Sequence, residues 1–585
     1  MTMRLKLAST AALMALCLLF AAPAGAADSA GPQLKAAIDA LLNQLDASTH
    51  GQLKWEGSDR MAIHEEGDAA IAEITNARFS IHAPADKPAA TLAHLTLGHV
   101  EIRRAPGPDG TSKLSIALPS ESILDTPDHG QTKITLKDAT ASAIVDGQSG
   151  MVRASTLAYA GARIDDKPTG DWVTFGPLTA SSKIAAAANG GWTGPIAFEQ
   201  KEIEFFATQG PASGAIDRIA YTALSSGPDL AAFNRLRQQL AALRQKNLSP
   251  PARLDATLDL LPGILSLFTM AKGELTLEGL VVRAPTGKPL VAIKKASLGG
   301  ALTGLSGEAA ALRVTFAQDG LNLAPNLIDP DKVPQRATVD IALEDVATGP
   351  LRTLLEAAGK LRQGTKPADK QQAEQQALGA AAMLNPTLRL YDLSIATPAV
   401  GIDATGVAKG SPLSPKGYTA AGDVAVRGFD ALGELAGHAP PAAYLPLLKE
   451  LGTPATADDG SPRLKFHLAS TPQKPITLNG SDISAWFAPN HPMPGRPRLL
   501  RPAEPAMTGT DVSAVQQALA AAHIAAPQNG AYDGATAAAV ARFQKANDLN
   551  VNGVADAATR LKLGLKPGPD ERDGPGHGRS RAGGN

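Results

Sequence analysis

The chain has 585 residues and a formal net charge of −1, and charged residues make up 19% of it. A balance this close to neutral argues against proteins that capture nucleic acid or acidic lipid through a strongly charged surface. Aromatic residues are only 4% of the chain, which argues against an open sugar-stacking cleft or a platform for stacked bases.

Residues 1–26 have the order of a secretory signal peptide. Two basic residues precede an apolar run from Leu7 to Ala22, and small residues then lead to Ala26. We therefore expect export to the periplasm or cell envelope with cleavage after Ala26, a retained anchor being the alternative. The only cysteine, Cys17, lies inside this segment, so the mature chain would have no disulfide and no thiol for metal binding or catalysis.

A helix is predicted within residues 27–50, ahead of a long strand-rich body at residues 51–485. Leucine and isoleucine recur at helical spacing between Leu34 and Leu45. From about Gly51 the pattern changes to alternating apolar and polar residues, as in KLSIALP and QTKITLKDATASAIV.

Asp109 and Gly110 lie between two alternating segments and give the signal of a β-hairpin turn. Alternation of this kind predicts an antiparallel sheet with one face toward water. The other face is apolar and has to be covered, either by the body's own helices or by an apolar ligand.

Strands and amphipathic helices take turns in the second half of the body. IAYTALSSGP at residues 219–228 and IALEDVATGP at residues 341–350 each precede a helical pattern, and residues 422–451 have the same order without the Gly-Pro. These units are either diverged copies of one strand-then-helix unit or chance similarities.

The C-terminal residues divide into three parts. Residues 486–506 are rich in proline and predict a semi-rigid linker. Residues 507–565 predict a compact three-helix module, and residues 566–585 predict a disordered tail. The expected fold class is therefore α+β, with a large antiparallel β-rich body, interspersed amphipathic helices and a small C-terminal three-helix module.

The module contains one turn motif written twice, NGAYDGAT at residues 529–536 and NGVADAAT at residues 552–559. In each copy Asn-Gly supplies left-handed turn conformations. An Asp then precedes a Thr by three residues. This spacing predicts that the Asp caps the next helix and that the Thr side chain, in the first turn of that helix, makes the reciprocal capping hydrogen bond. The expected structural caps are Asp511, Asp533, Thr536, Asp556 and Thr559.

The sequence around these turns has the order D-V-x-x-V-Q-x-x-L from Asp511, N-G-x-Y-D-x-x-T-x-x-A-V-x-x-F-Q from Asn529, and L-x-V-x-G-V-x-D-x-x-T from Leu549. This order resembles the three-helix peptidoglycan-binding domain of bacterial cell-wall enzymes, and the resemblance implies peptidoglycan as a partner. His523 departs from the family pattern, which usually has glycine there, and the Asp and Asn residues of the two turns also differ from the usual residues.

Four side chains of the module are candidates for peptidoglycan contact, namely Gln516, Tyr532, Arg542 and Gln544. Arg542 could pair with a stem-peptide carboxylate, and Tyr532 could lie against a sugar face. The alternative for an exposed arginine on a helix is that it belongs to an ordinary solvated face.

Residue patterns that carry catalysis or bind metals are absent from the sequence. His64 precedes two glutamates but lacks a second histidine at the zinc-hydrolase spacing. His94 and His99 would lie on opposite faces of one strand, and the sequence around Ser306 lacks the second glycine of a nucleophile elbow. We therefore expect a non-enzymatic protein with no metal and no cofactor, a wall hydrolase with an unrecognised site being an alternative.

Together these features predict an exported envelope protein that is tethered to peptidoglycan through its C-terminal module. The body is similar in texture to large bacterial envelope proteins of unknown function. A lipid or other apolar ligand, or another envelope protein, is a further candidate partner of the body, and nucleic acid is not.

Overall fold

The computed structural model of the protein describes residues 30 to 565 except for 50–51, 84–90, 128–129, 148–150, 188–189, 209–212, 363–366, 411–416, 437–444, 458–459, 472–475, 485–499, 504–505, 548 and parts of 246–265. The predicted signal peptide, the predicted tail and most of the predicted linker lie outside these residues. The chain divides into two compact units, Met1–Ala425 and Val426–Asn585. In the part of the chain that the structure describes, no helix combines the length and apolarity needed to cross a membrane.

The first unit is built on antiparallel strands, as the alternation predicts. It opens with helix α2 (Ala30–Ser48), which confirms the predicted N-terminal helix. The strands of its first half are β1 (Leu53–Gly57), β2 (Arg60–Glu66), β3 (Ala69–His82), β4 (Thr91–Pro106), β5 (Thr111–Ala117), β6 (Glu121–Thr126), β7 (Gly130–Lys137), β8 (Thr140–Asp146), β9 (Val152–Tyr159), β10 (Gly161–Asp166), β11 (Asp171–Phe175), β12 (Leu178–Lys183) and β13 (Ala185–Ala186). The hairpin signal is confirmed, because Asp109 and Gly110 both have positive φ (54° and 70°) between β4 and β5.

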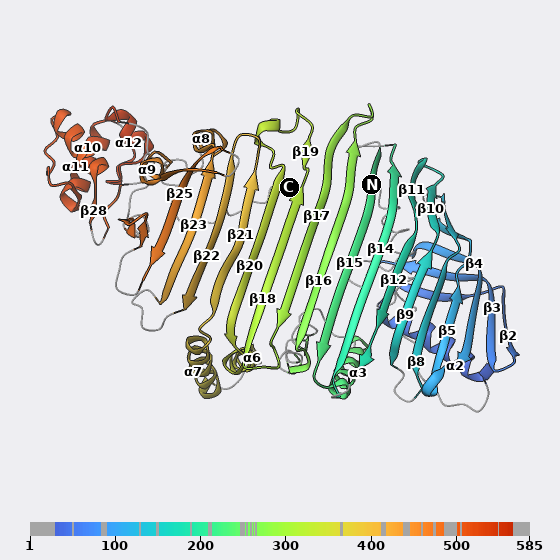
Figure 1. Ribbon diagram of the computed structural model, residues 1–585. Helices are drawn as coiled ribbons and strands as arrows, with labels where there is room; N and C mark the ends of the chain where they lie inside the picture. The colour runs from blue at the N-terminus through green and yellow to red at the C-terminus, as the bar shows by residue number, and fades with distance from the viewer. Residues whose placement is uncertain are drawn as a thin grey trace. The chain divides into compact units, whose positions relative to one another are not determined.

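The second half of this unit consists of longer strands that lie side by side in chain order (Figure 1). They are β14 (Trp192–Phe206), β15 (Ser213–Gly227), β16 (Met270–Arg283), β17 (Pro289–Thr303), β18 (Ala309–Asp319), the short β19 (Asn322–Leu323), β20 (Arg336–Ala347), β21 (Thr387–Ala396) and β22 (Gly401–Gly410), followed by β23 (Tyr418–Arg427). Two of them lead directly into the helices α3 (Leu230–Gln245) and α6 (Thr348–Arg362), and α7 (Pro367–Met383) follows α6.

Most strands of the first half come in collinear pairs. The neighbours of β5 are β4 and β8, and those of β6 are β4 and β7, so β5 and β6 continue each other along one line. The same holds for β8 with β7, β9 with β10, and β12 with β11. Each pair is therefore one long strand with a break in its middle.

The breaks of neighbouring strands meet in one line across the sheet. The amide of Leu118 donates to the carbonyl of Ala139 (3.0 Å), and the amide of Ala160 donates to the carbonyl of Lys137 (2.8 Å). Four residues with positive φ mark this line, namely Asn76 in β3 (52°), Asp138 in the break between β7 and β8 (52°), Glu202 in β14 (50°) and Gly279 in β16 (66°). We call these four residues the slip line.

The slip line shifts the alternation of each strand by one residue. In β3 the buried residues Ile74, Ala77 and Phe79 are separated by three and then by two positions. In β14 the buried Gln200 and Ile203 enclose the exposed Glu202 in the same way. A β-strand normally presents every second residue to one face, and an extra residue at the break reverses this order. The apolar pattern of the sequence shifts by one residue at the same place, so apolar side chains stay on the same side of the sheet beyond the break.

The first half of the unit encloses a closed apolar core. Leu34 and Ile38 of α2 are 0% and 3% exposed, and they belong to one cluster with apolar residues of the strands from β1 to β14. Phe198 of β14 and Ile219 of β15 pack against this cluster at its border and are only partly buried. The core therefore ends where the longer strands begin.

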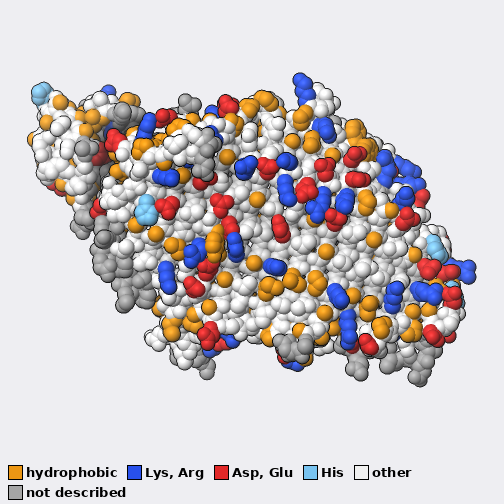
Figure 2. Space-filling model, in the orientation of Figure 1, with side chains coloured by type: hydrophobic (Ala, Val, Ile, Leu, Met, Phe, Trp, Pro, Cys, Tyr) orange, Lys and Arg blue, Asp and Glu red, His pale blue; other side chains and the backbone are white. Residues whose placement is uncertain are grey.

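The longer strands have an apolar face and a polar face. One row of direct cross-strand neighbours consists of Phe198, Tyr221, Leu275, Leu298, Phe316, Val339, Leu393 and Ala404. The rows on either side of it on the same face are also mainly apolar or glycine. On the opposite face, lysine, arginine, aspartate and glutamate side chains are interspersed over the strands (Figure 2).

The described helices do not cover the apolar face. Figure 1 shows α3, α6 and α7 at one end of the strands. There α6 packs on a small cluster that includes Leu305, Ala310 and Val346. Leu275, Leu298 and Phe316, in the middle of the apolar face, are 44%, 52% and 39% exposed. Covering by the body's own helices, the simpler of the two alternatives, is therefore not observed among the described residues.

The second unit begins with short elements and ends with the predicted module. Its elements are α8 (Phe429–Ala436), α9 (Leu445–Leu451), β24 (Thr453–Thr456), β25 (Pro462–Ser470), β26 (Thr477–Leu478), β27 (Ser481–Asp482), β28 (Met507–Thr508), α10 (Thr510–Ala521), β29 (Ala531–Tyr532), α11 (Gly534–Ala546) and α12 (Ala557–Lys562). The three helices α10, α11 and α12 confirm the predicted three-helix module, and a cluster of buried apolar residues from Leu500 to Ala555 forms its core.

Candidate functional site

The module is organised around two buried glutamines that lie on successive helices. Gln516 of α10 and Gln544 of α11 are both 0% exposed. The Gln516 amide nitrogen donates to Asn529 Oδ1 (2.9 Å), to the carbonyl of Ala531 (2.9 Å) and to Thr536 Oγ1 (3.0 Å). Its oxygen accepts from the amide of Gly530 (2.9 Å). Every polar atom of this side chain is therefore used inside the module.

Gln544 makes the same set of contacts with the second turn. Its nitrogen donates to Asn552 Oδ1 (2.9 Å), the carbonyl of Val554 (2.9 Å) and Thr559 Oγ1 (3.0 Å). Its oxygen accepts from the amide of Gly553 (2.9 Å). Each copy of the turn motif therefore makes the same set of hydrogen bonds to a buried glutamine. In both cases the glutamine belongs to the helix that precedes the turn.

The turns themselves have the geometry that the sequence predicts. Gly530 and Gly553 both have φ of +67°, a conformation that residues with a Cβ rarely adopt. Asp533 and Asp556 occupy the N-cap positions of α11 and α12, and each accepts from the backbone amide three residues later at 2.8 Å. These two structural caps are confirmed.

The other predicted caps require correction. The hydroxyl of Thr536 donates inward to the carbonyl of Ala531 (3.1 Å) and accepts from Gln516, so it does not cap the helix. Thr559 likewise accepts from Gln544. Helix α10 begins at Thr510 with Gly509 at the N-cap, and Asp511 lies in its first turn with its carboxylate accepting from the amide of Val512 (3.0 Å).

Three of the four predicted contact residues are interior. Gln516, Gln544 and Tyr532 are each 0% exposed. The Tyr532 hydroxyl donates to the carbonyl of Gly553 (3.0 Å), and burial raises the pKa of this phenol above its ordinary value. Because these side chains are committed to the core, they cannot be surface contacts for a polymer, and a structural role replaces the predicted one.

Arg542 is the predicted contact that remains at the surface. It lies on the exposed side of α11, where its guanidinium donates to the carbonyl of Ala525 (2.8 Å). This hydrogen bond orients the side chain without neutralising its charge. Arg542 is therefore available to an anionic group.

Two residues of the module were not among the candidates. Leu500, inside the predicted linker, is 0% exposed, and its carbonyl accepts from the amide of Ala555 (2.9 Å). The module therefore begins at least seven residues before its predicted start. Arg560 is 5% exposed and donates from Nε to the carbonyl of Ala555 (3.1 Å). An arginine gives no sequence signal of burial, whereas Leu500 is an apolar residue of a type that is often buried.

The Asp533 cap predicts how the module responds to acid. A hydrogen bond from the Thr536 amide, followed by one from the Asn529 side chain, holds the pKa of Asp533 below its ordinary value of 3.8. A group with a lowered folded pKa stabilises the fold fully above its unfolded pKa, and this contribution is lost as the pH falls through the folded pKa. We therefore expect the thermal midpoint of the module to fall as the pH is lowered from about 5 to about 2.

Asp533→Asn should flatten this acid limb, because asparagine also caps helices and does not titrate. Differential scanning calorimetry of the wild type and the variant across the pH range makes the comparison, with near-neutral pH as the control condition. If the thermal midpoints of the two proteins fall in parallel as the pH is lowered, the ionised Asp533 cap does not contribute to the stability of the module.

The described residues contain no group of three or more His, Cys, Asp or Glu side chains placed to hold a metal ion. The family described as "Putative peptidoglycan binding domain" matches residues 508–563, which include all three helices of the module. Neither a curated protein nor a solved structure matches the chain significantly.

Proposed function

We propose that the chain is an exported, non-enzymatic envelope protein whose C-terminal module tethers the body to peptidoglycan. The observation that carries the proposal is the family match at residues 508–563 together with a module whose core is complete. Its core is a cluster of ten buried apolar residues, and both turn-holding glutamines have their full set of partners. Association with peptidoglycan is the property that the family match supports directly.

The organisation of the chain supports the tethering role. The module is about a tenth of the protein, and the first unit is a separate compact body. A small binding module attached to a large body fixes that body to a polymer and raises its local concentration there. The non-enzymatic part of the proposal is supported by the sequence, whose mature part has no cysteine and no recognised catalytic motif.

Sedimentation with purified sacculi tests the tether. The mature chain is compared with a chain that ends at Ala485, because an end point after Leu500 would leave part of the module core attached. We expect the full chain to co-sediment, the shortened chain to remain in the supernatant, and no muropeptide to be released. Equal sedimentation of the two chains would refute the tether, and muropeptide release would refute the non-enzymatic role.

A point variant tests the surface of the module. Arg542→Glu should weaken sedimentation several-fold because it replaces a cation with an anion beside the glycan's acidic stem peptides. Lys545→Glu, an equivalent change at an exposed position of the same helix, is the matched control. If the two variants sediment equally, the proposal that Arg542 contacts peptidoglycan is wrong.

A second candidate function, binding of an apolar ligand by the body, is favoured by the apolar face of the longer strands. Large exposed apolar surfaces on soluble proteins usually mark binding sites. At about 4.8 Å between strands, the row from Phe198 to Ala404 extends about 35 Å. A surface of this length without charged side chains suits hydrocarbon chains, which need neither hydrogen bonds nor counter-ions.

A fluorescent fatty acid tests this second function. We expect its emission to rise on addition of the mature chain, and Leu298→Glu to reduce the effect because it puts a charge in the middle of the apolar face. Ser297→Glu, on the same strand and the opposite face, is the matched control. An unchanged signal with Leu298→Glu would remove the apolar face as the binding surface.

A further inference from the structure

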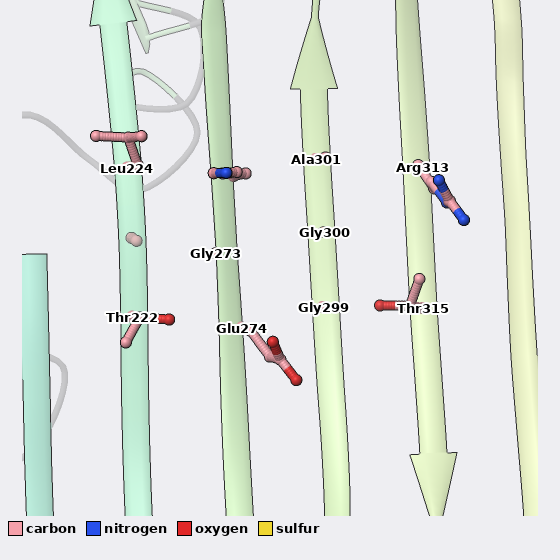
Figure 3. A pocket seen from close by; sticks show the side chains of 11 residues that line it. Thr222, Leu224, Gly273, Glu274, Gly299, Gly300, Ala301, Arg313 and Thr315 are labelled. Carbon is pink, nitrogen blue, oxygen red and sulfur yellow. The ribbon is translucent and has the colours of Figure 1, made fainter. Parts of the chain in front are cut away.

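A depression of about 420 Å³ lies on the polar face of the longer strands. Its floor is the backbone of β17 at Gly299, Gly300 and Ala301, between the side chains of β16 and β18 (Figure 3). Neighbouring strands are about 4.8 Å apart, so the walls stand about 10 Å from each other. The depression exists because the central strand has no side chain larger than a methyl group at these positions.

Two charged residues on one wall lack the partners that their neighbours have. Nearby charges of this face are paired, such as Arg218 with Glu278 (3.5 Å) and Lys295 with Glu278 (3.3 Å). Lys272 and Glu274 of β16 are both exposed, and neither makes an ion pair with any residue that the structure describes. They form a cation and an anion on the rim of a depression, each free to bind a ligand.

The polar groups around Glu274 converge over the floor. Figure 3 shows the Glu274 carboxylate leaning toward β17 and the Thr315 hydroxyl pointing back toward it from β18. A Cβ on Gly299 would overlap this hydroxyl, so glycine is required for Thr315 to take its position. Thr222, on the other side of Glu274, directs its oxygen from β15 toward β16 and is not part of this pair. A carboxylate and a hydroxyl that face each other across an open floor suit an ammonium group.

Arg313, on the opposite wall, is directed away from the depression. Its Nε donates to Asp340 Oδ1 (2.7 Å), and its guanidinium lies over the ring of Tyr391 (4.6 Å to the centroid). Lys272 is therefore the cation that remains for a ligand. Being two positions from Glu274 on one strand, it is about 7 Å away along β16.

We propose that this depression binds a short zwitterionic peptide, with its ammonium group at Glu274 and Thr315 and its carboxylate at Lys272. Two extended residues span about 7 Å, which matches the spacing of the two charges. A dipeptide lying along β16 places both of its ends on opposite charges and its backbone over the glycine floor. The site is separate from the module, and it would give the body its own contact with peptide ends.

Titration of the full mature chain with dipeptides tests the proposal by isothermal calorimetry, without sacculi. We expect glycylglycine to bind with a Kd of about 1 mM, and N-acetylglycylglycine and glycylglycine amide to bind at least tenfold more weakly because each lacks one charge. D-alanyl-D-alanine and L-alanyl-L-alanine distinguish a wall-derived peptide from one of protein origin. Equal binding of the capped and uncapped peptides would overturn the proposal.

Charge exchange provides the second test. Lys272→Glu and Glu274→Lys should each abolish dipeptide binding, and the double exchange should restore it with the peptide reversed. Lys295→Glu, on the same face but outside the depression, should bind like the wild type. Both positions are exposed, and melting curves check that the variants fold. No recovery in the double variant would refute the charge arrangement, whatever the outcome with sacculi.

Discussion

Replacing Gln516 with leucine should unfold the C-terminal module while the body stays folded. Leucine fills a similar volume but leaves the buried amide of Gly530 without a partner. It also removes one of the hydrogen bonds made by Asn529 Oδ1, the carbonyl of Ala531 and the hydroxyl of Thr536, which keep their other contacts. The unsatisfied amide costs about 1–3 kcal/mol, and each of the three other lost hydrogen bonds costs about 0.5–1.5 kcal/mol. The total is comparable with the whole stability of a domain of this size, which is about 3–9 kcal/mol.

Calorimetry and limited proteolysis of the full chain measure this effect. We expect the transition of the module to disappear and cleavage to begin within residues 508–563. Gln517→Leu is the matched control, because the next residue along α10 is exposed and makes none of these contacts. If Gln516→Leu melts like Gln517→Leu, the buried glutamine does not hold the turn.

Gly279→Ala should destabilise the body by about 3 kcal/mol, the sum of left-handed strain and overpacking. Gly279 has φ of +66°, and a Cβ there would overlap the side chain of Asp217 on the neighbouring strand. The contact includes the Cβ of Asp217, so a change of rotamer cannot relieve it. The strands have to move apart at the slip line.

Gly287→Ala separates the two causes. Gly287 lies in the turn of the same hairpin with φ of +81°, and nothing lies within 4 Å of a Cβ added there. It should therefore cost only the left-handed strain, about 1 kcal/mol. Asp217→Gly in the Gly279→Ala background should recover the difference. Chemical denaturation followed by tryptophan fluorescence gives the free energies of unfolding, and equal losses for the two alanine variants would contradict the packing argument.

Alternation along the sequence is sufficient to predict the strands, because a half-buried strand needs an apolar residue at every second position. It does not predict how these strands pair over distance. Nothing in KLSIALP indicates that β5 has β8 as its second neighbour, while β6 continues its line. The sequence also does not predict that the apolar face is exposed, because this depends on where α3, α6 and α7 pack in the folded protein.

The candidate site shows a similar division. Asn-Gly and Asp at fixed spacing predict the two turns and the Asp533 and Asp556 caps, because local conformation determines both. Burial of Gln516, Gln544 and Tyr532 depends on contacts between helix and turn, and polar side chains are usually expected at the surface. One sequence signal was available: each glutamine directly follows a core residue, Val515 or Phe543, and precedes one copy of the turn.

A strand that alternates without interruption can slide by two residues against its neighbour and still bury the same face. Slides of this kind are a common route to mispaired sheets, and a sheet with many similar strands has many chances to make them. The slip line disfavours such slides. In a displaced strand, the one-residue shift of its alternation would no longer lie beside the shift of the neighbouring strand. Apolar side chains on one side of the shift would then point toward water. The slip line thus favours one register for the pairing of each of these strands with its neighbours.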